Sequence, residues 1–154
     1  TAPEWASGIT GATIVRKTAD EIVNNSAVLQ NDDALLLAML ANEVWAIDVI
    51  LLNISATATP LMKVSYTLPA AASLYGRVEY TTTAGAQAQA ALYPTSYETA
   101  IYITTSIQCY YKARLIVING ANAGNFQLQW AQNVATVEDT TMKTNSCLIA
   151  WKVA

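Results

Sequence analysis

Histidine is absent from this 154-residue sequence, and charged side chains make up only 12% of it. Without an imidazole the chain forms no Ser-His-Asp or Cys-His catalytic group, and it offers no histidine ligand to zinc or haem iron. A typical soluble domain has about 25% charged residues. The low charge therefore indicates either a neutral polar coat or extensive burial against other chains, and composition alone leaves both open.

Basic stripes and long apolar runs are also missing. The 8 basic residues are scattered and the net charge is -3, so no surface is predicted that could follow a phosphate backbone. The most apolar windows, residues 34–41 and 44–52, are bounded or interrupted by acidic residues. Both are much shorter than the roughly 20 apolar residues of a membrane-spanning helix. We expect neither a nucleic-acid nor a membrane partner.

The few cysteines and glycines exclude further kinds of site. Cys109 and Cys147 fit neither a CxxC redox motif nor a metal-ligand pair, and we predict that they are free thiols packed as small hydrophobes. The six glycines are dispersed and form no phosphate-binding loop. We therefore expect no catalytic residues and no cofactor.

Apolar and polar residues alternate along most of the chain, which is typical of β-strands. In residues 61–68, Met62, Val64 and Tyr66 alternate with more polar neighbours, and the strand ends before Pro69, which cannot donate a backbone hydrogen bond. The same pattern predicts about eight strands in all, the others at residues 13–17, 44–53, 77–83, 100–106, 110–119, 125–133 and 147–153. The sequence thus predicts an all-β fold.

Two details of packing follow from local signals. Asn119-Gly120 is a turn signal, so residues 110–119 and 125–133 are expected to pair as a hairpin. The tryptophans that fall on an apolar face of a strand are assigned to the core: Trp45, Trp130 and Trp151.

Residues 18–41 and 84–97 give weaker signals. The first segment is rich in Ala, Leu and Met, which allows two short helices, but Asn24-Asn25-Ser26 interrupts the first of them. Short apolar runs do not distinguish a helix from a strand. Strands are the favoured interpretation and helices the alternative. Residues 84–97 are small and uncharged and include a proline, which indicates a long loop or a neutral contact surface.

Three acidic pairs occupy residues 20–21, 32–33 and 138–139. Carboxylates are the acid-base groups present in number, but the spacing of these pairs matches neither a glycosidase nor an EF-hand calcium loop. We interpret them as solvated carboxylates in turns and expect no metal site. A weak cation site at Asp32 and Asp33 is the alternative.

Tyrosines cluster between residues 93 and 111. Aromatic platforms bind carbohydrate or partner proteins, so Tyr93, Tyr97 and Tyr102 are candidate partner-contact residues. Packing in the core and between subunits is the favoured alternative for these side chains.

Two blocks of the chain carry a family resemblance. Residues 17–45 read KTADEIVNNSAVLQNDDALLLAMLANEVW, and residues 124–133 read GNFQLQWAQN. These blocks resemble the patterns KxADExVxxSxxLQxDDxLxxxxxANExW and GxxxLQWAQN of small β-sandwich virion proteins of tailed bacteriophages. Residues 55–107, between the two blocks, carry much less of the resemblance.

The resemblance implies a jelly-roll-like antiparallel β-sandwich over residues 14–154, with no catalytic residues. In such a sandwich residues 34–40 would be a strand that pairs through the turn at residues 41–43 with residues 44–53, which disfavours the helices. It also implies a capsid decoration (cement) protein that binds the outer capsid surface as a homotrimer. Such a protein stabilises the shell by bridging major capsid protein subunits, and it is assembled in the bacterial host cytoplasm. The alternative role is a tail- or fibre-associated virion protein, or a receptor- or carbohydrate-binding module.

Residues 1–13 are expected to form an N-terminal arm. The segment is nearly uncharged and precedes the first predicted strand. Its residues 1–12 lack both a basic residue and a continuous apolar run, so they do not resemble a signal peptide. Pro3, Trp5 and Ile9 are the candidates for anchoring this arm to a capsid.

Overall fold

The computed structural model describes residues 11–81, 86–92, 99–101 and 109–154, and the described part is all-β. Its twelve strands are, in chain order, β1 (Thr13–Arg16), β2 (Glu21–Val23), β3 (Gln30–Met39), β4 (Val44–Ser55), β5 (Met62–Thr67), β6 (Ser73–Thr81), β7 (Gln87–Leu92), β8 (Thr99–Ile101), β9 (Cys109–Ile118), β10 (Gly124–Gln132), β11 (Thr140–Met142) and β12 (Cys147–Lys152). The predicted arm, residues 1–13, lies outside the described residues except for residues 11–13.

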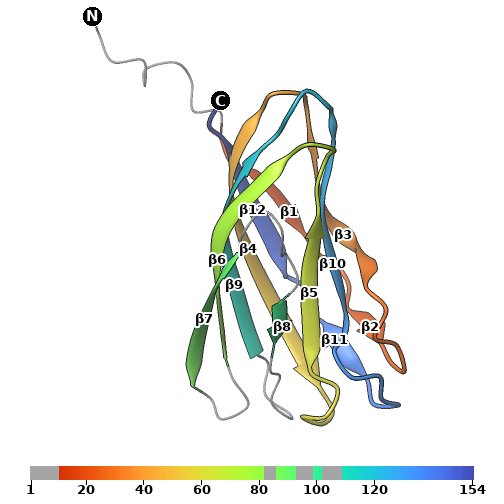
Figure 1. Ribbon diagram of the computed structural model, residues 1–154. Helices are drawn as coiled ribbons and strands as arrows, with labels where there is room; N and C mark the ends of the chain where they lie inside the picture. The colour runs from red at the N-terminus through yellow and green to blue at the C-terminus, as the bar shows by residue number, and fades with distance from the viewer. Residues whose placement is uncertain (1–10, 82–85, 93–98, 102–108) are drawn as a thin grey trace, which may run out of the picture.

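The strands form two antiparallel sheets that pack face to face (Figure 1). The larger sheet has the order β1-β12-β4-β9-β6-β7, with β11 and β2 attached beside the end of β4. The smaller sheet has the order β3-β10-β5-β8. The sets β1-β12-β4-β9 and β3-β10-β5-β8 together have the strand order of a jelly roll. The expected all-β jelly-roll sandwich is therefore confirmed.

Four strands are additional to this eight-stranded framework. The β6-β7 hairpin extends the larger sheet beyond β9, and β2 pairs with β11 at one end of the sandwich. Residues 84–97, expected to be a loop or a contact surface, contain β7, because Gln87 to Leu92 pair in register with Thr81 to Gly76.

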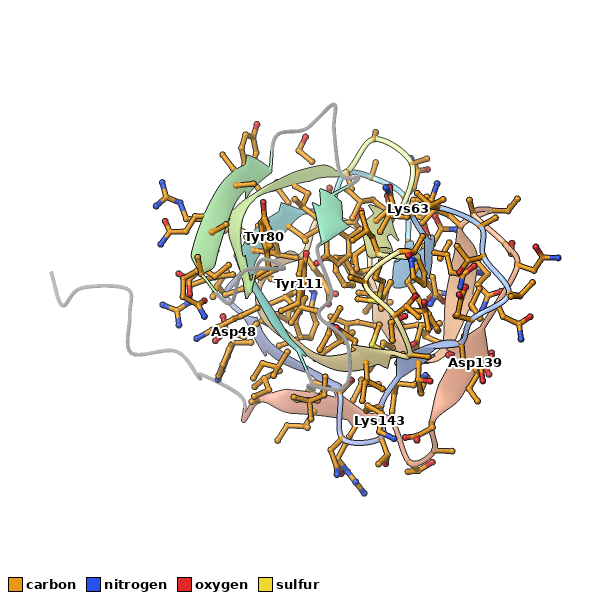
Figure 2. The ribbon with its side chains drawn as sticks, turned by 90° about the horizontal axis from the view of Figure 1, so that it is seen from below. Asp48, Lys63, Tyr80, Tyr111, Asp139 and Lys143 are labelled. Atoms are coloured by element: carbon orange, nitrogen blue, oxygen red, sulfur yellow. The ribbon has the colours of Figure 1, made fainter. Side chains whose placement is uncertain are left out.

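Alternating side chains of both sheets fill the interior, as the period-two pattern predicts. In β4 every second residue from Trp45 to Ser55 is buried. The largest fully buried side chains include Trp130, Tyr111 and Phe126. Figure 2 looks along the sandwich and shows Tyr111 pointing into this filled interior, while Asp48 lies on the outside of the larger sheet. The interior of the described part is thus a packed core.

The segment at residues 18–41 forms strands, and the alternative of two helices is wrong. The expected pairing of this segment with residues 44–53 is also wrong, because β3 pairs with β10 in the smaller sheet while β4 lies in the larger one. The turn between them passes through Asn42, whose φ is 63°. This turn carries the chain across the core, so that Leu37 and Ile47 are buried from opposite sheets.

The expected hairpin of residues 110–119 with 125–133 is wrong for the same reason. β9 belongs to the larger sheet and β10 to the smaller one. The two crossing turns are joined by hydrogen bonds. Asn42 N donates to the Gly120 carbonyl at 2.8 Å, and Asn119 Nδ2 donates to the Leu40 carbonyl at 2.6 Å. Asn119-Gly120 therefore marks a connection between sheets.

Trp45 and Trp130 lie in the core as predicted, but the assignment of Trp151 is wrong. In β12 the buried residues are Leu148 and Ala150, and Trp151 is half-buried on the opposite face. The reason is that both faces of this strand are apolar, so alternation alone does not show which face turns inward.

Candidate functional site

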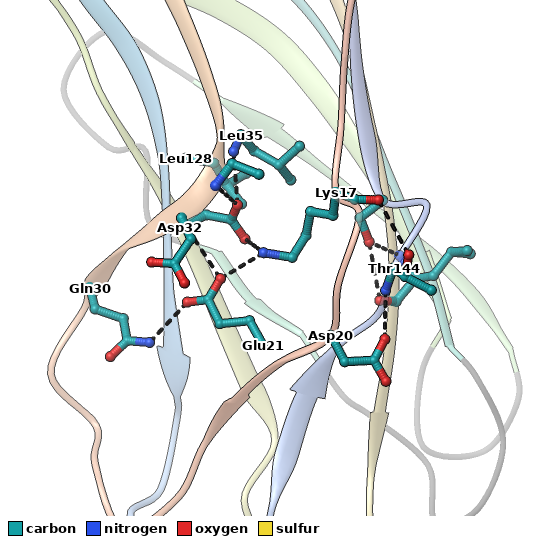
Figure 3. A network of polar contacts seen from close by, with 12 residues as sticks. Lys17, Asp20, Glu21, Gln30, Asp32, Leu35, Leu128 and Thr144 are labelled. Atoms are coloured by element: carbon teal, nitrogen blue, oxygen red, sulfur yellow. Dashed lines mark hydrogen bonds and ion pairs between the residues drawn. The ribbon is translucent and has the colours of Figure 1, made fainter.

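Two acidic residues of the first motif block, Glu21 and Asp32, belong to a buried ion network with Lys17 (Figure 3). Lys17 follows β1, and its Nζ lies 2.8 Å from Asp32 Oδ2 and 2.6 Å from Glu21 Oε2. Lys17 and Asp32 are each only 2% exposed. The network thus joins the end of β1 to the start of β2 and to β3.

Both carboxylate oxygens of Asp32 and its backbone carbonyl have partners in this network. Its Oδ1 accepts hydrogen bonds from the backbone N–H groups of Ala34 and Leu35, at 2.9 and 2.8 Å. Gln127 of β10 donates from Nε2 to the Asp32 carbonyl at 3.0 Å. A buried charge is tolerated where an opposite charge and hydrogen bonds satisfy it, so this arrangement links the strands structurally. We call the side chains of Lys17, Glu21 and Asp32 the staple.

The charges of the staple exclude two chemical roles. Burial on its own would lower the pKa of Lys17, but hydrogen bonds and charges of Asp32 and Glu21 outweigh it and raise the pKa. Lys17 therefore stays protonated and does not serve as a base or nucleophile. The same ammonium is the cation that contacts Asp32, one of the two residues of the alternative weak cation site at Asp32 and Asp33. No group of three or more potential metal-ligating side chains occurs among the described residues.

The interpretation of the acidic pairs as solvated carboxylates in turns holds for only part of them. That interpretation is wrong for Asp32, which is buried, whereas Asp33 and Asp139 are exposed. Asp20 is bonded to Lys143 and accepts the Thr144 N–H, and these contacts lower its pKa. It therefore ties the start of β2 to the turn before β12.

Two further motif residues, Glu43 and Gln132, make hydrogen bonds that stabilise turns. Glu43 Oε2 accepts hydrogen bonds from Leu40 N at 2.8 Å and from Trp45 Nε1 at 3.0 Å, and its Oε1 lies 2.9 Å from Lys152 Nζ. Burial acts to raise the pKa of Glu43, but these contacts lower it on balance. In the second block, Gln132 Oε1 accepts hydrogen bonds from the Ser26 and Thr136 N–H groups. Its Nε2 donates to the Glu138 carbonyl.

A pair of tyrosine hydroxyls is buried in the core. Tyr66 of β5 and Tyr111 of β9 share a hydrogen bond of 2.7 Å between their oxygens. Burial raises the pKa of both hydroxyls. Ionised tyrosine is therefore disfavoured in the folded protein.

This pair predicts a loss of stability at high pH. Unfolded tyrosines ionise near pH 10, while the folded pair stays protonated, so the contribution is complete below pH 10 and falls above it. We expect each tyrosine to lower the free energy of unfolding by about 1.4 kcal/mol per pH unit there. Urea unfolding at pH 9 and 11 measures this loss. The double variant Tyr66→Phe/Tyr111→Phe should lose much less, and an equal loss in both proteins would contradict the assignment.

The predicted contact residues are not brought together by the described structure. Pro3, Trp5, Ile9, Tyr93, Tyr97 and Tyr102 all lie outside the described residues. Cys147 is a free, half-buried thiol, and burial raises its pKa, which disfavours the reactive thiolate. The described part of the chain contains no helix that could span a membrane.

The outer face of the larger sheet carries a feature that alternation alone did not reveal. The register places Tyr75 of β6, Ile116 of β9, Ala46 of β4 and Trp151 of β12 in one row across four strands. Tyr75 and Ile116 are 48% and 41% exposed, and the next row adds Ile118, at 45%. We call these five residues the outer strip. It lies near the end of the sheet where Val44 meets the C-terminal Ala154.

Comparisons with known proteins show only distant similarity. No protein-family model matches the chain, and no curated protein matches it. Among solved structures it is similar to the VP2 subviral particle of infectious bursal disease virus, with 8% identity and a TM-score of 0.28 over 96% of this chain. A structure of the Gx strain of that virus gives 7% identity and a TM-score of 0.27 over 94% of this chain. The chain spans about two fifths of the length of these two viral chains, 43% and 40%.

Proposed function

We propose that this protein is a capsid decoration (cement) protein of a tailed bacteriophage. It binds the outer capsid surface as a homotrimer and stabilises the shell by bridging major capsid protein subunits. The proposal gives it no catalytic activity and places its assembly in the bacterial host cytoplasm. Its support is the jelly-roll fold, the two motif blocks and the outer strip.

The outer strip is the observation that carries the proposal. Soluble monomers rarely expose contiguous apolar patches beyond a few hundred Å², and larger patches mark contact sites. Here Tyr75 and Ile116 are neighbours, Ala46 separates Ile116 from Trp151 in the same row, and none of these side chains belongs to the buried core. An exposed apolar row on a sheet face suits a protein contact better than a small-molecule site, which is concave.

The low charge of the chain supports the same function. Burial of apolar surface contributes about 25 cal/mol per Å², from which the cost of ordering is subtracted. A neutral surface adds little cost for the desolvation of charged groups when it binds. In the proposal the strip and the arm at residues 1–13 contact the capsid together, and three linked copies strengthen binding through avidity.

Imaging of assembled particles with and without this protein tests the proposal. We expect additional density on the capsid, and we expect Ile116→Glu to reduce particle-bound protein at least tenfold, since it places a charge within the contact. Val137→Glu is the matched control, because Val137 is 80% exposed in the loop before β11, away from the strip. Density on the tail alone, or equal retention of both variants, would overturn the proposal. Light scattering that shows a monomer at micromolar concentration would refute the trimer.

A further inference from the structure

A small basic hollow lies next to the outer strip on the same face of the larger sheet. It has a volume of about 170 Å³ and is lined by Arg77 and Glu79 of β6 and by Lys112 and Arg114 of β9. Arg77 and Tyr75 are two positions apart on β6, and Arg114 and Ile116 are two positions apart on β9. Residues two apart in a strand point to the same face, so the hollow and the strip adjoin.

The charges that line the hollow are unbalanced. Three cations face one carboxylate, and of the cations only Arg114 is paired, with its Nε 3.1 Å from Asp48 Oδ1. Arg77 donates from Nη1 to the neutral Gln89 Oε1 at 2.8 Å. Among the described residues, neither Arg77 nor Lys112 makes an ion pair. Most donors of the Arg77 guanidinium therefore remain open.

The two arginines also stand directly opposite each other. Arg77 and Arg114 are register partners in the antiparallel pair of β6 and β9. Like charges in directly opposite positions destabilise a sheet, and an anion between them removes this repulsion. Guanidinium groups bind carboxylates in a planar, two-bond geometry that fits such a position.

We propose that this hollow binds the carboxylate of an acidic side chain on the partner protein, while the outer strip contacts the apolar residues beside it. The inference rests on the proposed function in taking this face as the contact surface, and it names the partner's chemistry: a carboxylate flanked by apolar side chains. The carboxylate contacts Arg77 first, because Asp48 already engages Arg114.

Peptide titration of the purified protein, followed by NMR, tests this inference without particles. The probe is acetyl-Leu-Asp-Leu-amide, and the matched probe has Asn in place of Asp. We expect the Asp peptide to shift the side-chain N–H signals of Arg77 and Arg114 and the methyl signals of Ile116. The Asn peptide should bind about tenfold more weakly. Arg77→Gln should lower the affinity for the Asp peptide by about the same factor.

Arg16→Gln is the matched control. Arg16 projects from β1 on the same face and its removal changes the charge equally, but it bonds Asn145 and lies outside the hollow. Its affinity for the Asp peptide should be that of the unmodified protein. Equal binding of both peptides, no binding at millimolar concentration, or an equal response to inorganic phosphate without methyl shifts would overturn the inference. So would the same shifts on raising protein concentration alone, which would assign the face to a second copy.

Particle binding separates this inference from the proposed function. If particles retain Arg77→Gln as well as the unmodified protein, the carboxylate contact is refuted and the decoration function stands. If unmodified protein fails to bind particles while the peptide results hold, the decoration function is refuted and the carboxylate site stands.

Discussion

Replacing Lys17 with methionine should lower the free energy of unfolding by about 3–5 kcal/mol. The substitution leaves Asp32 charged and buried, with its Oδ2 deprived of the ammonium 2.8 Å away. The cost of a buried charge without its partner exceeds the value of the intact pair, which explains the size of the effect. Urea unfolding at neutral pH measures it.

The matched control is Lys143→Met. Lys143 also pairs with an aspartate, Asp20, but both side chains are about one-third exposed, at 30% and 37%. Exposed ion pairs contribute about 0–1 kcal/mol, so this variant should stay within that range.

A double substitution tests whether Lys17 and Asp32 act as one unit. Asp32→Asn keeps an oxygen for the Ala34 and Leu35 N–H groups while removing the charge. Added to Lys17→Met, it should restore part of the lost stability. Strictly additive losses would show that the two residues contribute independently.

The strands and the core could be predicted because alternation is a local property of the sequence. Met62, Val64 and Tyr66 alternate with less buried residues, and the structure buries all three. The direction of the turns could not be predicted in this way. Asn42 and Asn119-Gly120 are turn signals whether the chain returns within a sheet or crosses to the other one. The two crossing turns are joined by a hydrogen bond from Asn119 to Leu40, 79 positions away, for which the local turn signals contain no indication.

The role of the acidic pairs was hidden for a similar reason. Asp32 and Asp33 are neighbours of the same type, but only Asp32 meets Lys17 and the distant Gln127. The spacing of residues along the chain contains no signal for a partner 95 positions away. The motif block does contain Lys17, Glu21 and Asp32 together, which is the one sequence feature that could have indicated a staple.

The error at Trp151 has a different origin, and it bears on function. Both faces of β12 are apolar, which exceeds what the core requires. A sequence pattern that disagrees with the fold is expected where a residue serves a contact. The misassigned tryptophan is thus the one that lies in the outer strip.

Trp130→Ala and Trp151→Ala should separate these two uses of tryptophan. Trp130 is 0% exposed and lies in the middle of the smaller sheet, between Gln30 of β3 and Val64 of β5. Removing its side chain leaves a cavity, so the free energy of unfolding should fall by about 3–5 kcal/mol. Chemical unfolding of the purified variant measures this loss.

Trp151→Ala should have the opposite profile. Trp151 is half-buried on the outer face, so its removal opens no internal cavity and should cost less than about 1.5 kcal/mol. Its effect should instead appear as a loss of particle binding. The folded fraction of Trp130→Ala should bind particles normally. If the two variants lose equal stability, or if Trp151→Ala binds particles normally, the outer strip is part of the fold and not a contact surface.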